Sequence, residues 1–265
     1  MLTLPIPKDK KVYFSSDFHL GYPNFKESLN RERHLLQWLN SIQGDAAAVF
    51  LMGDLFDFWF EYRKVVPKGF VRFLGKLANM SDEGIQIHIF PGNHDLWMWD
   101  YFTKEFQAKI HPEPMRLSLE WPDGKQELFI GHGDGLGPGD WGFKSLRKVF
   151  AHALPQWLFK WLHPDLGVAL AHFWSSSGKS SLQKAQNFDS ESDFLLSYVK
   201  SQHQEIKAQG SQVNAFVFGH RHWPLDFDLG DGTHYYNLGD WFLEDFQHAR
   251  YLTVSAQTIE FNTYA

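Results

Sequence analysis

The chain contains no cysteine, so disulfide bridges, thiolate metal sites and cysteine nucleophiles are excluded. Any transition metal must therefore be bound through nitrogen and oxygen atoms. A long uninterrupted apolar run is also missing, because Lys160, His163 and Asp165 interrupt the most apolar stretch, residues 150 to 174. A helix that crosses a bilayer needs about 20 mostly apolar residues. The sequence therefore predicts no membrane span, although this stretch is suited to lie on a membrane surface.

The first residues, MLTLPIPKDKK, lack the apolar core of a secretory signal peptide. We therefore expect a cytoplasmic protein, with the inner face of the cytoplasmic membrane as a peripheral location. Positive charge is scarce, because 25 Lys and Arg against 31 Asp and Glu give a formal net charge of -6. Nucleic-acid binding needs a basic surface, so we expect no nucleic-acid partner unless the basic residues gather locally.

Apolar and aromatic residues are abundant, at 43% and 17% of 265 residues, which is enough for one large domain spanning residues 1 to 265. Five nearly continuous apolar runs, each typical of a strand covered on both faces, lie at residues 11–19, 46–54, 85–94, 128–134 and 214–222. Amphipathic helical patterns at residues 27–42 and 67–81 separate the first three. This alternation predicts a layered α/β fold. After residue 222 the pattern changes to strands and turns, with a probable hairpin at Asp231 and Gly232.

Polar residues cluster where the five apolar runs end. They are Asp17, His19, Asp54, Asn93, His94, His132, His220 and His222. One such residue alone is usually a turn or capping residue. The carboxyl ends of strands in an open α/β sheet form the ligand site, so we expect all of these side chains to converge on one edge. Asp, Asn and His without Lys or Arg are the ligands that a metal site needs.

The charge of this cluster points to phosphoryl transfer. Seven of these residues, all except His94, are the predicted ligands. They would carry only two negative charges, on Asp17 and Asp54, because histidines bind metal in the neutral form. Two divalent cations balanced by these carboxylates and one hydroxide leave a net charge of about +1 (4 minus 3), which favours an anionic phosphate over a neutral ester. Nitrogen and oxygen ligands suit manganese, with iron or zinc as alternatives.

Five short blocks now resemble a known family. DFH at 17–19, GDLFD at 53–57, GNHD at 92–95, GHGD at 131–134 and GHRH at 219–222 occur in the order found in the calcineurin-like metallophosphoesterases. The resemblance implies an α/β fold of two packed sheets flanked by helices. It also implies that Asp17, His19, Asp54 and His222 hold one metal, and that Asp54, Asn93, His132 and His220 hold the other.

The same resemblance implies that His94 faces the phosphate without binding metal, and that Asp95 orients His94. We expect Asp57, Asp134 and Asp240 to support the site without acting as ligands. The histidines outside the blocks are interpreted as ordinary surface or core residues; these are His34, His88, His111, His152 and His248.

Within that family the chain is most similar to the UDP-2,3-diacylglucosamine diphosphatases of lipid A biosynthesis. The resemblance lies in GDLFDFW at 53–59, in YYNLGDW at 235–241 and in a helical cap insertion at about residues 138–210. It implies hydrolysis of a lipid-linked UDP-sugar to UMP and 2,3-diacylglucosamine 1-phosphate. The best-known form of the subfamily has an arginine where this chain has His94, which suggests a sister branch.

The insertion is rich in aromatic and basic residues, a composition that suits either an anionic membrane surface or an acyl-chain groove. The alternative is that these aromatics only pack the cap onto the core. Residues predicted to contact substrate are Phe143, Arg147, Lys179 and Lys184. Two other functions remain open. One is a general metallophosphoesterase for soluble nucleotides, phosphodiesters or phosphoproteins; the other is an inactive scaffold, disfavoured because no predicted ligand is missing.

Overall fold

The computed structural model describes residues 1–139, 144, 147, 149–150, 152–170, 193–242 and 249–264. Three of the predicted substrate contacts, Phe143, Lys179 and Lys184, lie outside these described residues.

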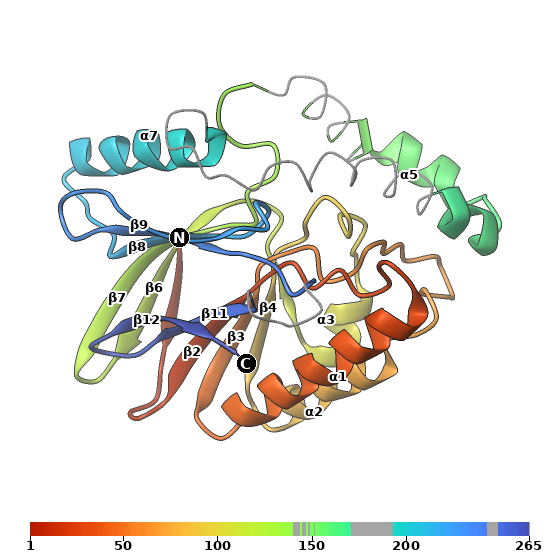
Figure 1. Cartoon of the computed structure of the whole chain (residues 1–265), viewed down its shortest axis with the longest axis horizontal. Helices are drawn as coiled ribbons and strands as arrows, with labels where there is room; N and C mark the ends of the chain where they lie inside the picture. Colours follow the sequence, from red (N-terminus) through yellow and green to blue (C-terminus); the bar gives the residue numbers. More distant parts are fainter. Residues whose placement is uncertain are drawn as a thin grey trace.

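Two six-stranded mixed sheets form the centre of the molecule (Figure 1). The strands of the first sheet, in spatial order, are β1 (Leu2–Pro5), β6 (Met115–Trp121), β7 (Gly124–Ile130), β8 (Ala215–Phe218), β10 (His234–Leu238) and β9 (Pro224–Asp228). Those of the second are β12 (Ile259–Thr263), β11 (Arg250–Val254), β2 (Lys11–Ser15), β3 (Ala46–Leu51), β4 (Gln86–Ile89) and β5 (Lys109–Ile110).

One apolar core lies between the two sheets. Val12, Phe14 and Phe50 of the second sheet and Leu128 and Val217 of the first belong to one buried cluster. Each sheet is also covered on its outer face by helices, so the central strands are buried on both sides. This double burial explains why the central strands read as continuous apolar runs, without the alternation of a half-exposed strand.

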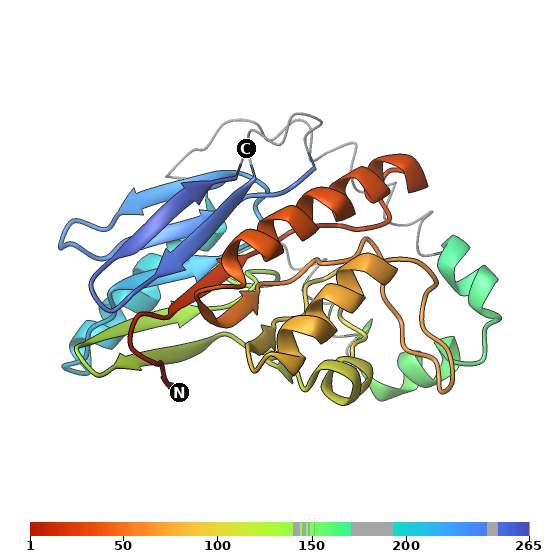
Figure 2. The same ribbon diagram turned by 90° about the horizontal axis from the view of Figure 1, so that it is seen from below.

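Helices complete a four-layer arrangement, helix, sheet, sheet, helix. Figure 2 shows α1 (Phe25–Ile42) and α2 (Val71–Asp82) side by side, and these two helices with α3 (Tyr101–Phe106) bury their apolar residues against the second sheet. Leu195, Leu196 and Val199 of α7 (Phe194–Ala208) pack on the first sheet. The fold class predicted from the family resemblance is confirmed.

The five predicted apolar runs form β2, β3, β4, β7 and β8, but the expectation that they share one sheet edge was wrong. β2, β3 and β4 pair in parallel in the second sheet, whereas β7 and β8 pair in parallel in the first. The carboxyl ends therefore meet across the junction between two sheets. A continuous apolar run shows that a strand is buried on both faces, but it does not show which sheet contains it.

The described part of the insertion divides its aromatic residues between two environments. The Phe159 ring of α5 (Ala153–Phe159) packs 4.6 Å from the Phe60 ring and 4.9 Å from the Trp97 ring. In contrast, Trp157 and Trp161 are 55% and 75% exposed. Packing onto the core thus accounts for only part of this aromatic set. The predicted insertion also includes α7, which belongs to the core layers.

No helix among the described residues is both long enough and apolar enough to cross a bilayer.

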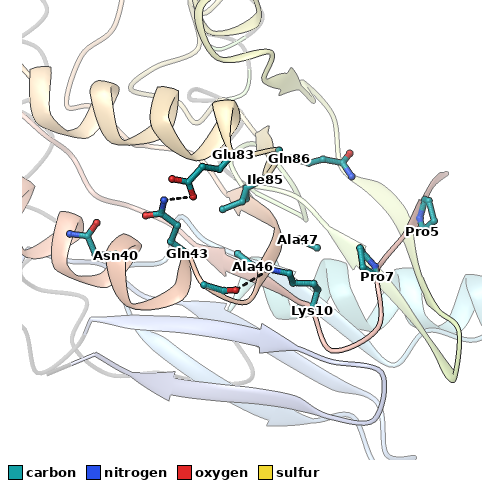
Figure 3. Close-up of a pocket in the computed structure, with 12 residues that line it drawn as sticks. Pro5, Pro7, Lys10, Asn40, Gln43, Ala46, Ala47, Glu83, Ile85 and Gln86 are labelled. Atoms are coloured by element: carbon teal, nitrogen blue, oxygen red, sulfur yellow. Dashed lines mark hydrogen bonds between the residues drawn. The ribbon is translucent and has the colours of Figure 1, made fainter.

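A groove of about 630 Å³ lies near the amino ends of β3 and β4, where α1 and α2 end (Figure 3). Lys10, Asn40, Gln43, Glu83 and Gln86 are among its lining residues. None of the predicted metal ligands lines it, because they follow the carboxyl ends of the strands. The groove is therefore separate from the predicted site.

Two histidines outside the predicted site form a buried pair between β4 and the residue after β5. Nδ1 of His88 lies 2.9 Å from Nε2 of His111, and the Phe50 ring stacks 4.3 Å from the His88 ring. Burial lowers the pKa of His88 to about 3 and that of His111 to about 4. Both histidines are therefore neutral in the folded protein at neutral pH.

This pair predicts acid sensitivity. The unfolded chain takes up protons on both histidines as the pH falls below about 6.5, whereas the folded protein resists protonation until about pH 4 to 3. The folded protein therefore loses stability relative to the unfolded chain as the pH falls below about 6.5. We expect a His88→Leu/His111→Leu variant to lose less unfolding free energy than the parent between pH 6.5 and 4, measured by urea denaturation. An exposed-site control, His163→Asn, should follow the parent; equal slopes for all three proteins would contradict the assignment.

Candidate metal centre

The predicted ligands come together on the loops that follow five strands. Their ligand atoms form two groups in which all atoms lie within 4.8 Å of one another. The first group contains Asp17, His19, Asp54 and His222, and the second contains Asp54, His132 and His220. Asp54 belongs to both groups, so a single carboxylate lies between two potential cation positions.

The distances within these groups exceed those of hydrogen bonds. Asp54 Oδ2 lies 3.3 Å from His132 Nε2 and 3.5 Å from His19 Nε2. Asp17 Oδ1 lies 3.5 Å from His222 Nε2. Side chains at these separations point their ligand atoms at a common centre without bonding one another. This spacing is compatible with ligands arranged around a cation.

Several of the converging atoms are buried without a hydrogen-bond partner in the described part of the chain. They are Asp17 Oδ1, Asn93 Oδ1 and His132 Nε2. Buried polar atoms are nearly always paired, and an exception in a native protein calls for an explanation such as an ion. A pair of divalent cations fits this donor set, because it consists of carboxylate, amide and imidazole atoms. The Asn93 side-chain oxygen is thus a buried acceptor that is available to a cation.

The loops hold these residues in strained backbone conformations. Five of them have positive φ angles, namely Asp17 at 57°, His19 at 41°, Asp54 at 51°, His220 at 70° and His222 at 54°. Left-handed φ values are uncommon outside glycine and cost about 1 kcal/mol or more each. The surrounding loops must be well packed to maintain them, and such strain concentrates at functional sites.

Glycines beside the ligands leave room for these turns. A Cβ added at Gly92 would overlap the Asp54 carboxylate, and one at Gly219 would overlap Ser16 and the Asp17 carboxylate. The glycines of GNHD and GHRH are thus required because the backbone passes directly against a ligand carboxylate.

Further acceptors orient the imidazoles from behind. The backbone carbonyl of Met52 lies 2.7 Å from His132 Nδ1, Asp240 Oδ2 lies 3.2 Å from His222 Nδ1, and Asp57 Oδ1 lies 3.6 Å from His19 Nδ1. An acceptor at Nδ1 keeps the proton there and leaves Nε2 for a metal. Asp240 therefore occupies a supporting position, as expected from the sequence. The Asp57 carboxylate instead belongs to a third group of possible ligand atoms, together with His19 and His94.

Burial and mutual attraction determine the charges of the cluster. Burial alone would raise the pKa of Asp54, but His132 and His94 hold it well below its usual range. Burial opposes protonation of His132, yet Asp54 and Asp17 raise its pKa to about 10. Burial, reinforced by His132, lowers the pKa of His220 to about 4. The protein thus retains an ionised carboxylate at the centre of the cluster.

His94 lies beside the cluster, but its partner differs from the one predicted. Nδ1 of His94 is 3.0 Å from the Asp57 carbonyl oxygen, and burial lowers the pKa of this histidine. Asp95 instead accepts the backbone N–H groups of Gly92 and Leu55, both at 2.7 Å. The prediction that Asp95 orients His94 was therefore wrong. Asp95 ties together the loops that follow β3 and β4.

Arg147, predicted to contact substrate, forms an ion pair with a core residue. Its Nε donates to Asp134 Oδ2. The carboxylate of Asp134 is 3% exposed. Asp134 thus has a supporting role near the site, and Arg147 connects the insertion to the GHGD loop.

Sequence reasoning missed Arg31, a buried cation of α1. Its Nε donates to the Trp241 carbonyl at 3.0 Å, and its Nη1 donates to the carbonyls of His19 at 2.9 Å and Tyr22 at 3.0 Å. Arg31 therefore fixes the loop that carries His19. A signal was present, because Arg31 lies four residues before Leu35 on the apolar face of the helix.

Comparison with known proteins agrees with this geometry. The family model described as calcineurin-like phosphoesterase matches residues 10–224. A protein of Porphyromonas gingivalis named UDP-2,3-diacylglucosamine hydrolase is 39% identical over 87% of this chain and 90% of its own length. A protein of the same name from Shewanella baltica is 24% identical over 94% and 95%. A solved structure described as a novel archaeal phosphodiesterase is 11% identical, covers 96% of this chain and 99% of its own, and has a TM-score of 0.43.

We expect Gly92→Ala to weaken cation binding at both positions, because the added methyl group would displace the carboxylate shared by the two groups. Elemental analysis after manganese loading should show fewer than two bound ions per protein chain. The rate of phosphoester hydrolysis should fall by at least about a hundredfold. Gly75→Ala is the matched control, because a Cβ at Gly75 meets open space. Full metal content in the Gly92 variant would contradict the shared role of Asp54.

Proposed function

The chain belongs to the calcineurin-like phosphoesterase family, and we propose that it hydrolyses the diphosphate of UDP-2,3-diacylglucosamine. The products are UMP and 2,3-diacylglucosamine 1-phosphate. The observation that carries this proposal is the 39% identity, over most of both chains, to a relative named UDP-2,3-diacylglucosamine hydrolase. The buried aspartate and histidine cluster supplies ligands suited to that chemistry.

Two divalent cations, with manganese as the proposed metal, would supply an activated water and neutralise charge on the phosphoryl group. One cation would be held by Asp17, His19, Asp54 and His222, and the other by Asp54, Asn93, His132 and His220. Asp240 and the Met52 carbonyl keep the imidazoles of His222 and His132 oriented. The protein forms no covalent bond to the substrate in this reaction.

The reaction is a direct displacement at phosphorus. The oxygen of water forms a bond to the α-phosphorus, and the bond from that phosphorus to the bridging oxygen breaks, so the lipid-linked phosphate leaves with the bridging oxygen. The Nδ1–H group of His94 donates a hydrogen bond to the Asp57 carbonyl, so Nε2 can donate to the phosphate only when the imidazole is protonated, a form that a nearby anionic phosphate favours. His94 is in this way positioned to bind the phosphoryl oxygens as charge develops.

The exposed side of the insertion suits the lipid part of the substrate. Leu154, Trp157, Leu158 and Trp161 lie on or next to α5 and are each more than half exposed. Exposed aromatic and aliphatic residues on one short helical segment favour contact with a lipid surface. The enzyme would therefore act as a peripheral protein on an anionic membrane. Phe143, Arg147, Lys179 and Lys184 remain proposed substrate contacts.

We expect manganese-loaded protein to release UMP from UDP-2,3-diacylglucosamine in detergent, as followed by phosphorus NMR. A His220→Ala/His222→Ala variant should lose at least about a thousandfold in rate, because one ligand is removed from each group. His234→Ala is the control, since His234 pairs with Asp226 on the protein surface. If the protein hydrolyses a soluble aryl phosphodiester but not the lipid substrate, the result would support a general phosphodiesterase instead.

Replacement of Trp157 and Trp161 by alanine should weaken binding to vesicles that contain anionic lipid, because these side chains offer the exposed apolar area. Co-sedimentation should fall by about tenfold, while turnover of detergent-dispersed substrate changes little. Phe25→Ala provides a control, because Phe25 is 78% exposed at the start of α1. Equal vesicle binding by the two variants would argue against contact through the insertion.

A further inference from the structure

Both ends of the insertion are joined to the loops of the candidate metal centre by arginine–aspartate ion pairs. At the start of the insertion, Arg147 pairs with Asp134 of the GHGD loop. At its end, Asp193 pairs with Arg221 of the GHRH loop at 2.9 Å. Asp134 lies two residues after His132, and Arg221 directly follows His220. Each pair thus lies beside a histidine of the second group.

The carboxylates of these pairs are buried, whereas the arginines are partly exposed. Asp134 and Asp193 are 3% and 4% exposed, and Arg147 and Arg221 are 24% and 33% exposed. Loss of the arginine would leave a buried carboxylate without its ion-pair partner, which strongly destabilises the folded protein. These contacts therefore constrain the loops more firmly than an exposed surface pair would.

Asp193 has a second task. Its Oδ1 accepts the backbone N–H of Leu196 at 2.8 Å and so caps α7, while its Oδ2 accepts Nε of Arg221 at 2.9 Å. The guanidinium of Arg221 also lies 5.0 Å from the Phe194 ring centre. The start of a core helix and the loop that carries His220 are therefore held by one side chain.

The segments around these pairs are closely packed. A Cβ at Gly133 would lie 3.0 Å from Leu195 Cδ2 and 3.3 Å from His220 Cβ. A Cβ at Gly135 would lie 3.3 Å from Arg147 Cδ. The GHGD and GHRH loops are also hydrogen-bonded to each other, because the Gly219 N–H donates to the His132 carbonyl at 2.9 Å. A displacement at either end of the insertion would therefore reach His132 and His220.

We propose that Arg147 and Arg221 are positioning residues that couple the seating of the insertion to the second cation position. This inference rests on the two-cation site of the proposed function. Two residues of the first group, Asp17 and His19, follow β2 of the other sheet, whereas His132 and His220 of the second group follow strands of the sheet on which α7 packs. Release of the insertion would therefore weaken the second cation position more than the first.

The direction of the effect separates positioning from simple electrostatics. Removal of an arginine near a cation site removes repulsion and should tighten cation binding if only charge matters. Loss of loop positioning should instead weaken it. Arg147→Gln is the cleaner test, because Arg147 pairs with the loop that carries His132, whereas Arg221 lies between two ligand histidines.

The experiment titrates the metal-free full-length protein with Mn²⁺ and follows the spectrum by electron paramagnetic resonance, which distinguishes one bound ion from a coupled pair. We expect Arg147→Gln to raise the dissociation constant of the second Mn²⁺ by about tenfold or more, with the first unchanged. Arg221→Gln should act in the same direction. Arg116→Gln, which breaks the ion pair between Arg116 of β6 and Glu127 of β7, should behave as the parent.

Arg147→Lys provides a second variant in case the glutamine substitution prevents folding, which a melting curve would reveal. Lysine keeps a positive charge for Asp134 but lacks the planar Nε donor, so it should give an intermediate loss of the second ion. A ratio of the two constants that is unchanged in both Arg147 variants, or a tighter second site, would overturn the coupling. A parent protein that never binds two ions would instead overturn the two-cation site.

Discussion

The site depends on one constraint, which is that Asp54 remains ionised inside the protein. Its side chain is almost completely buried, and burial of an isolated carboxylate is strongly unfavourable. His94 donates its backbone N–H to Asp54 Oδ1 at 2.9 Å, and two imidazoles face Oδ2. The glycine at position 92, the left-handed turn at Asp54 and the imidazoles oriented from behind all serve to hold this charge between two cation positions.

Support for this centre comes from side chains that contact neither substrate nor metal. Arg31 fixes the His19 loop through backbone carbonyls, Asp95 joins the loops after β3 and β4, and Asp193 joins α7 to the GHRH loop. Each is a buried ionisable group with at least one partner on another segment. These contacts hold the loops in place and so help to maintain the strained backbone at five ligands.

The sequence predicted much of this site because the ligands lie in short blocks at strand ends. The composition of the strands could not show which of the two sheets contains each strand, since a buried strand has the same composition in either one. It also could not reveal contacts such as Arg31 with Trp241, 210 positions apart, which depend on the complete tertiary structure. The family resemblance implied that Asp95 orients His94, but in the structure the Asp95 carboxylate accepts the N–H groups of Gly92 and Leu55.

The position of the ligands on two different sheets links metal binding to the stability of the folded protein. Asp17, His19 and Asp54 follow strands of one sheet, whereas His132 and His220 follow strands of the other. Cations bound by both sets would add their binding free energy to the cohesion of the sheet packing. Metal supply would then govern the abundance of folded protein, so that metal starvation would expose it to proteolysis as well as reduce its turnover.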